Sequence, residues 1–180
     1  MKFLDSLVAG IEGSALAEWL RTTAGAIPII EAAHVMGVAL VFGTILIVDL
    51  RLLGIPNRRR SFVRTSNELL RYTWLGFGLA AVTGVLMFVA NPATYVGNTL
   101  FWWKMAALLG AGVNMAVFEL VTSRGVKSWD RDTRPPPAAV AAAVLSIVIW
   151  TSVVVLGRWV GFVPDYDFSI PEDVELEFVF

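Results

Sequence analysis

Long runs of apolar residues, rather than an alternation of apolar and polar positions, dominate this 180-residue chain. Two uncharged runs, Tyr72–Ala90 and Ala138–Gly157, are long enough to cross a hydrocarbon core of roughly 30 Å as helices. Two further runs, Ala24–Leu50 and Thr99–Val121, are equally long but contain polar residues. Hydrophobic residues make up 57% of the chain and the mean hydropathy is +0.70, which is typical of an integral membrane protein. The pattern therefore predicts four membrane spans.

The predicted fold class is all-α, a polytopic membrane protein with a bundle of four transmembrane helices. Only helices and closed barrels satisfy their backbone groups in lipid, and these runs lack the two-residue alternation of barrel strands. We expect three regions: N-terminal interfacial helices over 1–23, the bundle over 24–163 and an acidic tail over 164–180. The predicted spans are 24–50, 72–90, 99–121 and 138–163.

Basic residues concentrate in two of the connections between the runs. By the positive-inside rule both connections are cytoplasmic, which places both termini and the 91–98 connection in the periplasm of a bacterial inner-membrane protein. Beside a spanning helix, the Arg58–Arg60 run indicates topology or contact with membrane lipids rather than nucleic-acid binding. The basic residues in question are Arg51, Arg58, Arg59, Arg60, Arg64 and Arg71 in the first connection, and Arg124, Lys127, Arg131 and Arg134 in the second.

The first twenty or so residues predict two short amphipathic helices that lie in the outer interface, separated near Gly13 with Ser14 as a cap. A cleaved signal peptide is the alternative, because Ala15-Leu16-Ala17 resembles a cleavage box. Asp5 and Glu12, however, interrupt its apolar region.

The chain ends in an acidic segment after Pro164, in which Val174, Leu176 and Phe178 alternate with acids. This alternation predicts a short strand. The strand could pack on the protein's own outer loops or add to a partner's sheet, which would join the chain to a homo-oligomer or a larger membrane complex.

Four polar side chains are predicted to lie at a similar depth near the outer ends of the spans. Glu31 and His34 are three residues apart on one helix face, and Asp49 lies farther along the same stripe. Lys104 and Arg158 reach about the level of Glu31 when residues are counted inward at about 1.5 Å each. Because charge in lipid is costly, the four should face each other inside the bundle. The minimal arrangement is an ion pair of Glu31 with either cation, which leaves positive charge for an anionic ligand.

His34, the single histidine, is also a candidate ligand for haem iron or copper. With Met87 or Met105 it would suit Cu(I) or a b-type haem, whose propionates Lys104 or Arg158 would meet. A quinone or a lipid headgroup is a further possibility for this cofactor-binding set, and a purely structural network of polar groups is another. These alternatives stay open at the level of the sequence.

The absence of cysteine excludes disulfides, thiolate catalysis and cysteine-ligated metal centres. The chain also lacks a His-Glu-x-x-His zinc motif, a phosphate loop and a nucleophile elbow, so no catalytic residues are assigned and we expect a protein that is not an enzyme.

Four short motifs follow one another between residues 24 and 160: Glu31-Ala-Ala-His34-Val-Met-Gly37, Asp49-Leu-Arg-Leu-Leu-Gly54, Thr83-Gly-Val-Leu-Met-Phe88 and Phe101-Trp-Trp-Lys104. With these motifs in this order, the chain resembles an uncharacterised family of small bacterial four-helix membrane proteins, a domain of unknown function. More distantly the chain is similar to CopD-type copper-resistance membrane proteins, which implies His34, Met87 and Met105 as the residues to carry over as copper ligands.

The predicted function is that of an accessory or binding protein with a polar site in the periplasmic leaflet, within a redox (electron-transfer) membrane complex. The alternatives are a copper-binding or copper-transport protein and a purely structural assembly subunit.

Overall fold

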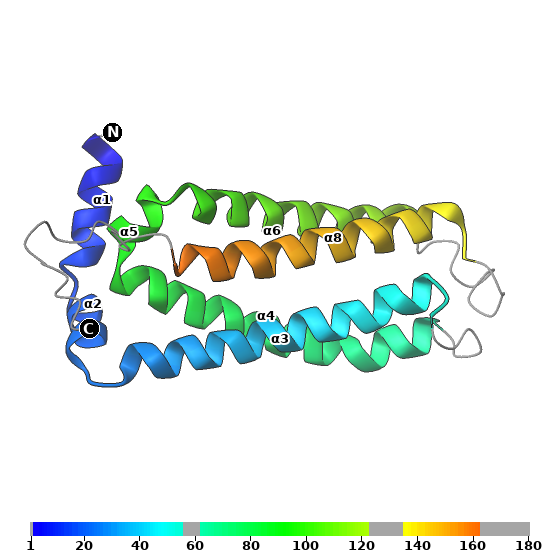
Figure 1. Ribbon diagram of the computed structural model, residues 1–180, viewed down its shortest axis with the longest axis horizontal. Helices are drawn as coiled ribbons and strands as arrows, with labels where there is room; N and C mark the ends of the chain where they lie inside the picture. The colour runs from blue at the N-terminus through cyan, green and yellow to red at the C-terminus, as the bar shows by residue number, and fades with distance from the viewer. Residues whose placement is uncertain (1, 56–61, 123–134, 163–180) are drawn as a thin grey trace, which may run out of the picture.

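The computed structural model describes residues 2–55, 62–122 and 135–162, and almost all of these residues are helical. Four long helices lie lengthwise beside one another (Figure 1): α3 Ala26–Leu52, α4 Phe62–Ala90, α6 Thr99–Val117 and α8 Pro137–Val160. In the described part of the chain four helices are long and apolar enough to cross a membrane. This confirms the predicted fold class.

Most boundaries of the long helices follow from local sequence signals. Pro137 occupies the first turn of α8, where its missing N–H costs nothing, and Pro28 lies in the first turn of α3 for the same reason. The second long helix begins at Phe62, before the predicted start at Tyr72, because the polar turns that precede the apolar run are helical as well. A π-helical turn, η1 Phe118–Thr122, extends the end of α6.

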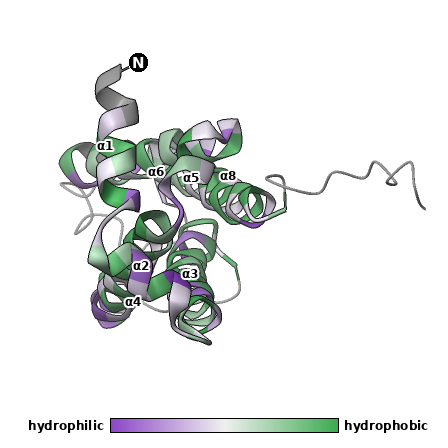
Figure 2. Ribbon diagram, turned by 90° about the vertical axis from the view of Figure 1, so that its left-hand side faces the viewer, coloured by the Kyte–Doolittle hydropathy of each residue, from purple (hydrophilic) through white to green (hydrophobic). Residues whose placement is uncertain are grey.

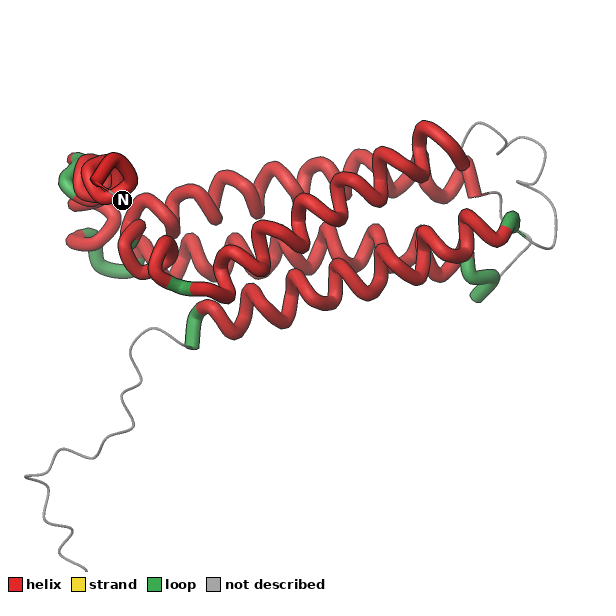
Figure 3. Tube along the Cα trace, turned by 90° about the horizontal axis from the view of Figure 1, so that it is seen from above, coloured by secondary structure: helices red, strands yellow, loops and turns green. Residues whose placement is uncertain are grey.

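The long helices form two antiparallel pairs. α3 packs along α4, α6 packs along α8, and α3 and α8 make the main contact between the two pairs. Figure 3, which views the bundle from above, shows the same lengthwise arrangement. Because the pairs are joined chiefly through α3 and α8, residues on these two helices decide how closely the halves of the bundle approach.

The α3–α4 pair is held by a seam without room for side chains. A Cβ added to Gly37 would lie 2.8 Å from the backbone nitrogen of Ala80 and 3.0 Å from the carbonyl oxygen of Gly76. Close backbone approach through small residues is the usual way in which helices pack in lipid, where no hydrophobic driving force acts between them. The seam therefore fixes which face of α3 meets α4.

Three short helices cover one end of the bundle, which we call the capped end: α1 Lys2–Glu12, α2 Ala15–Thr22 and α5 Pro92–Gly97. Ser14 caps α2 by accepting a hydrogen bond from the backbone N–H of Ala17 at 3.2 Å, as predicted. Arg21 ties α2 to the bundle through a 2.9 Å hydrogen bond to the carbonyl oxygen of Ala90. Figure 1 shows α1 running across the long helices, while the interfacial location of α1 and α2 stays a prediction.

The outward faces of the long helices are apolar, as lipid contact requires. Seen from the capped end in Figure 2, the long helices are predominantly hydrophobic. Leu109 on α6 and Ile29 on α3 expose 71% and 70% of their surfaces. The predicted acidic tail over 164–180, with its strand, and most of the two basic connections lie outside the described residues.

Candidate functional site

Near the capped end, His34 projects from α3 against α4. Its Nδ1 atom lies 2.9 Å from the carbonyl oxygen of Ala80 and 3.1 Å from the hydroxyl oxygen of Thr83. A carbonyl oxygen can only accept, so Nδ1 carries the hydrogen and donates it. The Thr83 hydroxyl in turn donates to the carbonyl oxygen of Leu79 at 2.6 Å, which leaves its oxygen free to accept from the ring. In the neutral imidazole, Nε2 therefore keeps its lone pair.

Gly84 makes room for the His34 ring on the surface of α4. A Cβ at this position would lie 3.2 Å from Cε1 and 3.5 Å from Nδ1 of His34. Any side chain at Gly84 would push against the imidazole, so the glycine and the two acceptors on α4 together fix the ring. The structure thus orients Nε2 by contacts that all come from one neighbouring helix.

Lys104 reaches the same region from α6, and its stem lies across Gly157 of α8. A Cβ added to Gly157 would lie 3.2 Å from Nζ and 3.3 Å from Cε of the lysine. The charge of Lys104 acts on the His34 ring. Lys104 is half-buried, and within the described residues its ammonium group has neither a hydrogen-bond acceptor nor an ion-pair partner. A cationic donor and a neutral acceptor nitrogen thus occupy the same region.

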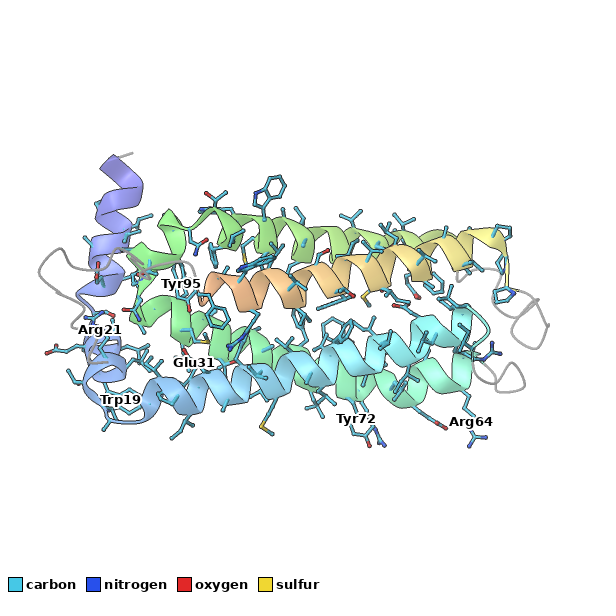
Figure 4. All side chains as sticks on the ribbon, in the orientation of Figure 1. Trp19, Arg21, Glu31, Arg64, Tyr72 and Tyr95 are labelled. Carbon is cyan, nitrogen blue, oxygen red and sulfur yellow. The ribbon has the colours of Figure 1, made fainter. Side chains whose placement is uncertain are left out.

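Tyr95 of α5 lies at the capped end, near Glu31 (Figure 4). Its ring centroid lies 5.5 Å from that of Phe101 and 6.1 Å from that of Phe88, so it is held in an aromatic cluster between α4 and α6. Burial raises the pKa of the Tyr95 phenol, and the nearby negative charge of Glu31 raises it further. Figure 4 shows Tyr95 and Glu31 at the same end of the bundle. We call the set Glu31, His34, Tyr95 and Lys104 the His34 site.

The structure brings together three of the four residues predicted at one level and leaves the fourth apart. Arg158 is exposed, and its guanidinium lies 4.3 Å from the centre of the Phe162 ring, a cation–π contact. The predicted ion pair of Glu31 with Lys104 or Arg158 is wrong for the described chain, in which Glu31 is exposed and neither cation lies within 4.0 Å of it. Counting residues along a helix gives depth but not direction, because each residue turns the side chain by about 100°.

The predicted sulfur ligands are placed on different helices from His34. Met87 on α4 and Met105 on α6 are both half-buried, and the hydrogen bonds of His34 go to Ala80 and Thr83 rather than to either sulfur. The described residues contain no group of three or more His, Asp and Glu side chains that could hold a metal ion. The copper set of one histidine and two methionines stays a prediction.

Sequence reasoning missed the partners that orient the candidate residues. These are the Ala80 carbonyl and Thr83 hydroxyl on α4, the packing glycines Gly84 and Gly157, and Tyr95 as a neighbour of Glu31. The sequence did contain a signal for Thr83 and Gly84, which are adjacent in an otherwise apolar span. A hydroxyl group next to a residue without a side chain leaves space and a hydrogen-bond partner for a polar side chain on a neighbouring helix.

Comparison with known proteins identifies the family. The model of a family of unknown function, DUF6644, matches residues 11–163, so the chain belongs to that family. Neither the curated proteins nor the solved structures give a match. The predicted membership of an uncharacterised membrane family is confirmed, whereas the comparisons do not show the likeness to CopD-type proteins.

Proposed function

We propose that this member of the DUF6644 family is a binding protein rather than an enzyme, and that it holds the polar head of an amphiphilic ligand in the His34 site. The observation that carries the proposal is the pairing of two unsatisfied groups in one region. Within the described part of the chain, Lys104 offers a cationic donor without an acceptor, and His34 offers a lone pair on Nε2 without a donor. Unsatisfied polar groups are costly in an apolar setting, so a ligand that satisfies both gains affinity.

A quinone head fits the two groups best among the ligands considered. A quinone carbonyl oxygen accepts from the Lys104 ammonium group, and a quinol hydroxyl donates to Nε2 of His34. The aromatic cluster of Phe88, Tyr95 and Phe101 supplies apolar ring faces beside the polar groups, and an isoprenoid tail would find the apolar outer faces of the helices. An anionic lipid headgroup shares the oxygen acceptors but lacks a flat ring.

A haem b group is the second candidate, and the orientation of His34 favours it. Histidines that bind metals usually donate their other ring N–H to a backbone carbonyl or a carboxylate, which fixes the ring and raises its basicity. The Nδ1–H of His34 does this toward Ala80. Nε2 would then bind the haem iron, and Lys104 would pair with a propionate.

The cellular setting is part of the same proposal. The basic residues between the first two and between the last two spans support a bacterial inner-membrane protein with both termini in the periplasm. The His34 site would then lie in the periplasmic leaflet. A membrane protein that binds the redox-active head group of a quinone but has no assigned catalytic residues suits the role of an accessory subunit in an electron-transfer complex.

The test begins with protein purified gently from its native membrane. We expect an organic extract to contain a quinone in an amount comparable with the protein, and the oxidised and reduced spectra to lack a Soret band. A Soret band that disappears in His34→Ala, together with iron, would establish the haem candidate instead. Copper without haem would favour the copper-binding alternative, and an extract that contains only lipid would assign the site to headgroups.

The residues that bind the ligand can be identified by comparing the affinities of ligand-free variants for a short-chain ubiquinone. Loss of a hydrogen bond to a charged group costs about 1.5 to 3 kcal/mol, so Lys104→Gln should weaken binding about tenfold to a hundredfold in calorimetric titrations. Arg158→Gln is the matched control, because it removes a basic residue from the same end of the bundle that lies apart from the site. Equal losses in the two variants would show a general charge effect and would contradict the proposed site.

A further inference from the structure

A second buried polar group lies toward the opposite end of the bundle from the His34 site. Asp49 is near the end of α3 and exposes only 6% of its surface, and Ser146 on α8 exposes 8%. The Asp49 carboxyl and the Ser146 hydroxyl share a side-chain hydrogen bond. Next along the same two helices, Leu52 packs against Ala139 and Ala143 in an apolar cluster. The pair therefore lies at the α3–α8 contact that joins the two halves of the bundle.

One oxygen of this carboxyl is unsatisfied. Oδ2 of Asp49 is fully buried, and within the described residues it has no hydrogen-bond partner. An ionised carboxylate at this place would leave negative charge on a buried oxygen that nothing compensates, which is costly in an apolar setting.

Among the described residues, no charged group on a neighbouring element forms an ion pair with the Asp49 carboxyl. On α4, Arg64 pairs with Glu68 at 2.8 Å and Arg71 stacks on Tyr72, while Arg158, the one charged residue of α8, lies at the capped end. Arg51 on α3 and Glu119 on η1 are the remaining charges nearby in sequence or packing, and in the described chain neither forms an ion pair with Asp49.

We propose that Asp49 is a proton-binding site. The carboxyl carries a proton, its O–H donates to the Ser146 hydroxyl, and Oδ2 remains as a neutral carbonyl oxygen. A neutral carbonyl oxygen without a partner is far less costly than an unpaired carboxylate. The neutral acid thus permits the close approach of α3 and α8 at this point.

A proton fits this site better than a metal ion. Hard cations such as Ca²⁺ and Mg²⁺ take six or more oxygen ligands, and here a single carboxyl and a single hydroxyl meet between helices whose carbonyl groups are engaged in backbone hydrogen bonds. Asp49 lies fifteen residues farther along α3 than His34, which is about 22 Å at about 1.5 Å per residue. Asp49 is therefore a site of its own, and the inference does not rest on the quinone proposal.

The decisive experiment is labelling of the full-length protein in detergent at neutral pH with dicyclohexylcarbodiimide, an apolar reagent. The O–H of a protonated carboxyl adds across one C=N bond: the proton passes to nitrogen, the carboxyl oxygen bonds to the central carbon, and the adduct rearranges to a stable N-acylurea without loss of atoms. We expect peptide mapping by mass spectrometry to place the adduct on Asp49, and the water-soluble carbodiimide to leave Asp49 unlabelled. Glu18→Gln, which removes an exposed carboxyl, should leave the labelling unchanged.

Infrared spectroscopy gives an independent readout. The spectrum should contain the C=O band of a protonated carboxyl that is lost in Asp49→Asn and moves to higher frequency in Ser146→Ala, because the latter removes its hydrogen-bond partner. An Asp49 peptide without adduct, or one labelled equally by the water-soluble reagent, would overturn the proposal. If Asp49→Asn fails to fold, the peptide map of the unaltered chain still decides the question.

Discussion

The Nδ1 atom of His34 lies 2.9 Å from the carbonyl oxygen of Ala80, and this contact between α3 and α4 sets the direction of the imidazole. The donor is committed to the neighbouring helix, so the free lone pair on Nε2 is the atom available for a ligand. The close approach of the two backbones through Gly37 brings α4 near enough for the contact to form. Helix packing and site chemistry are therefore linked through a single face of α3.

Replacement of Gly84 should disable the His34 site while the bundle stays folded. In Gly84→Val the new side chain would meet the ring, because even a Cβ would lie 3.2 Å from Cε1 of His34. We expect the ring to rotate away from Ala80 and the affinity for a short-chain ubiquinone to fall at least about tenfold, corresponding to loss of about 1.4 kcal/mol of oriented interaction. Gly78→Val on the same helix is the control, since nothing lies within 4 Å of a Cβ there. Similar affinities in both variants would refute the role given to the ring orientation.

Removal of the Lys104 charge should stabilise the ligand-free protein. Lys104→Met keeps a long flexible side chain across Gly157 but removes a half-buried cation that has no partner among the described residues. Because a charge at the helix centre costs about 2.5 to 3.5 kcal/mol and a snorkelling lysine avoids part of this, we expect a gain of about 1 kcal/mol in the free energy of unfolding. Thermal unfolding in detergent measures it. A marked loss of stability would instead indicate that Lys104 belongs to a structural network.

The sequence predicted the long helices, but not the directions in which the polar side chains point. The apolar runs predict where the long helices lie, and Pro28 and Pro137 predict where two of them begin. Both signals can be found in the sequence because the length of an apolar run and the missing N–H of proline are local properties. The facing of His34 toward α4 depends on the Gly37 seam, which is a contact between segments far apart in the chain. Arg158 shows the consequence, because its guanidinium contacts the Phe162 ring and does not pair with Glu31.

The Gly37 seam should tolerate no added atom. In Gly37→Ala the new methyl group would lie 2.8 Å from the backbone nitrogen of Ala80, and a backbone atom cannot move without shifting α4. Overpacking of this kind costs about 1 to 3 kcal/mol, which outweighs the gain of about 1 kcal/mol in helix propensity from glycine to alanine. Gly43→Ala on the same helix has open space and should be neutral or stabilising. Thermal unfolding of the two variants tests the difference, and equal stability would show that α3 and α4 can slide apart at no cost.

The titration of Tyr95 reports its proximity to Glu31. Burial and the Glu31 charge both raise the pKa of the phenol above its ordinary value of about 10, so the folded protein favours the neutral phenol. The sign follows from linkage: this contribution to stability is fully present below the pKa of the unfolded chain and is lost as the pH rises through the higher pKa of the folded state. We expect Glu31→Gln to lower the pKa of Tyr95 and to leave unchanged the part of the shift that burial causes.

Ultraviolet absorbance of tyrosinate as a function of pH measures this shift, and Tyr95→Phe identifies which of the three tyrosines is responsible. Glu18→Gln on α2 is the matched control, because it removes an exposed carboxylate that does not act on Tyr95. An unchanged Tyr95 titration in Glu31→Gln would mean that Glu31 points away from α5, and the His34 site would then lack its acidic member.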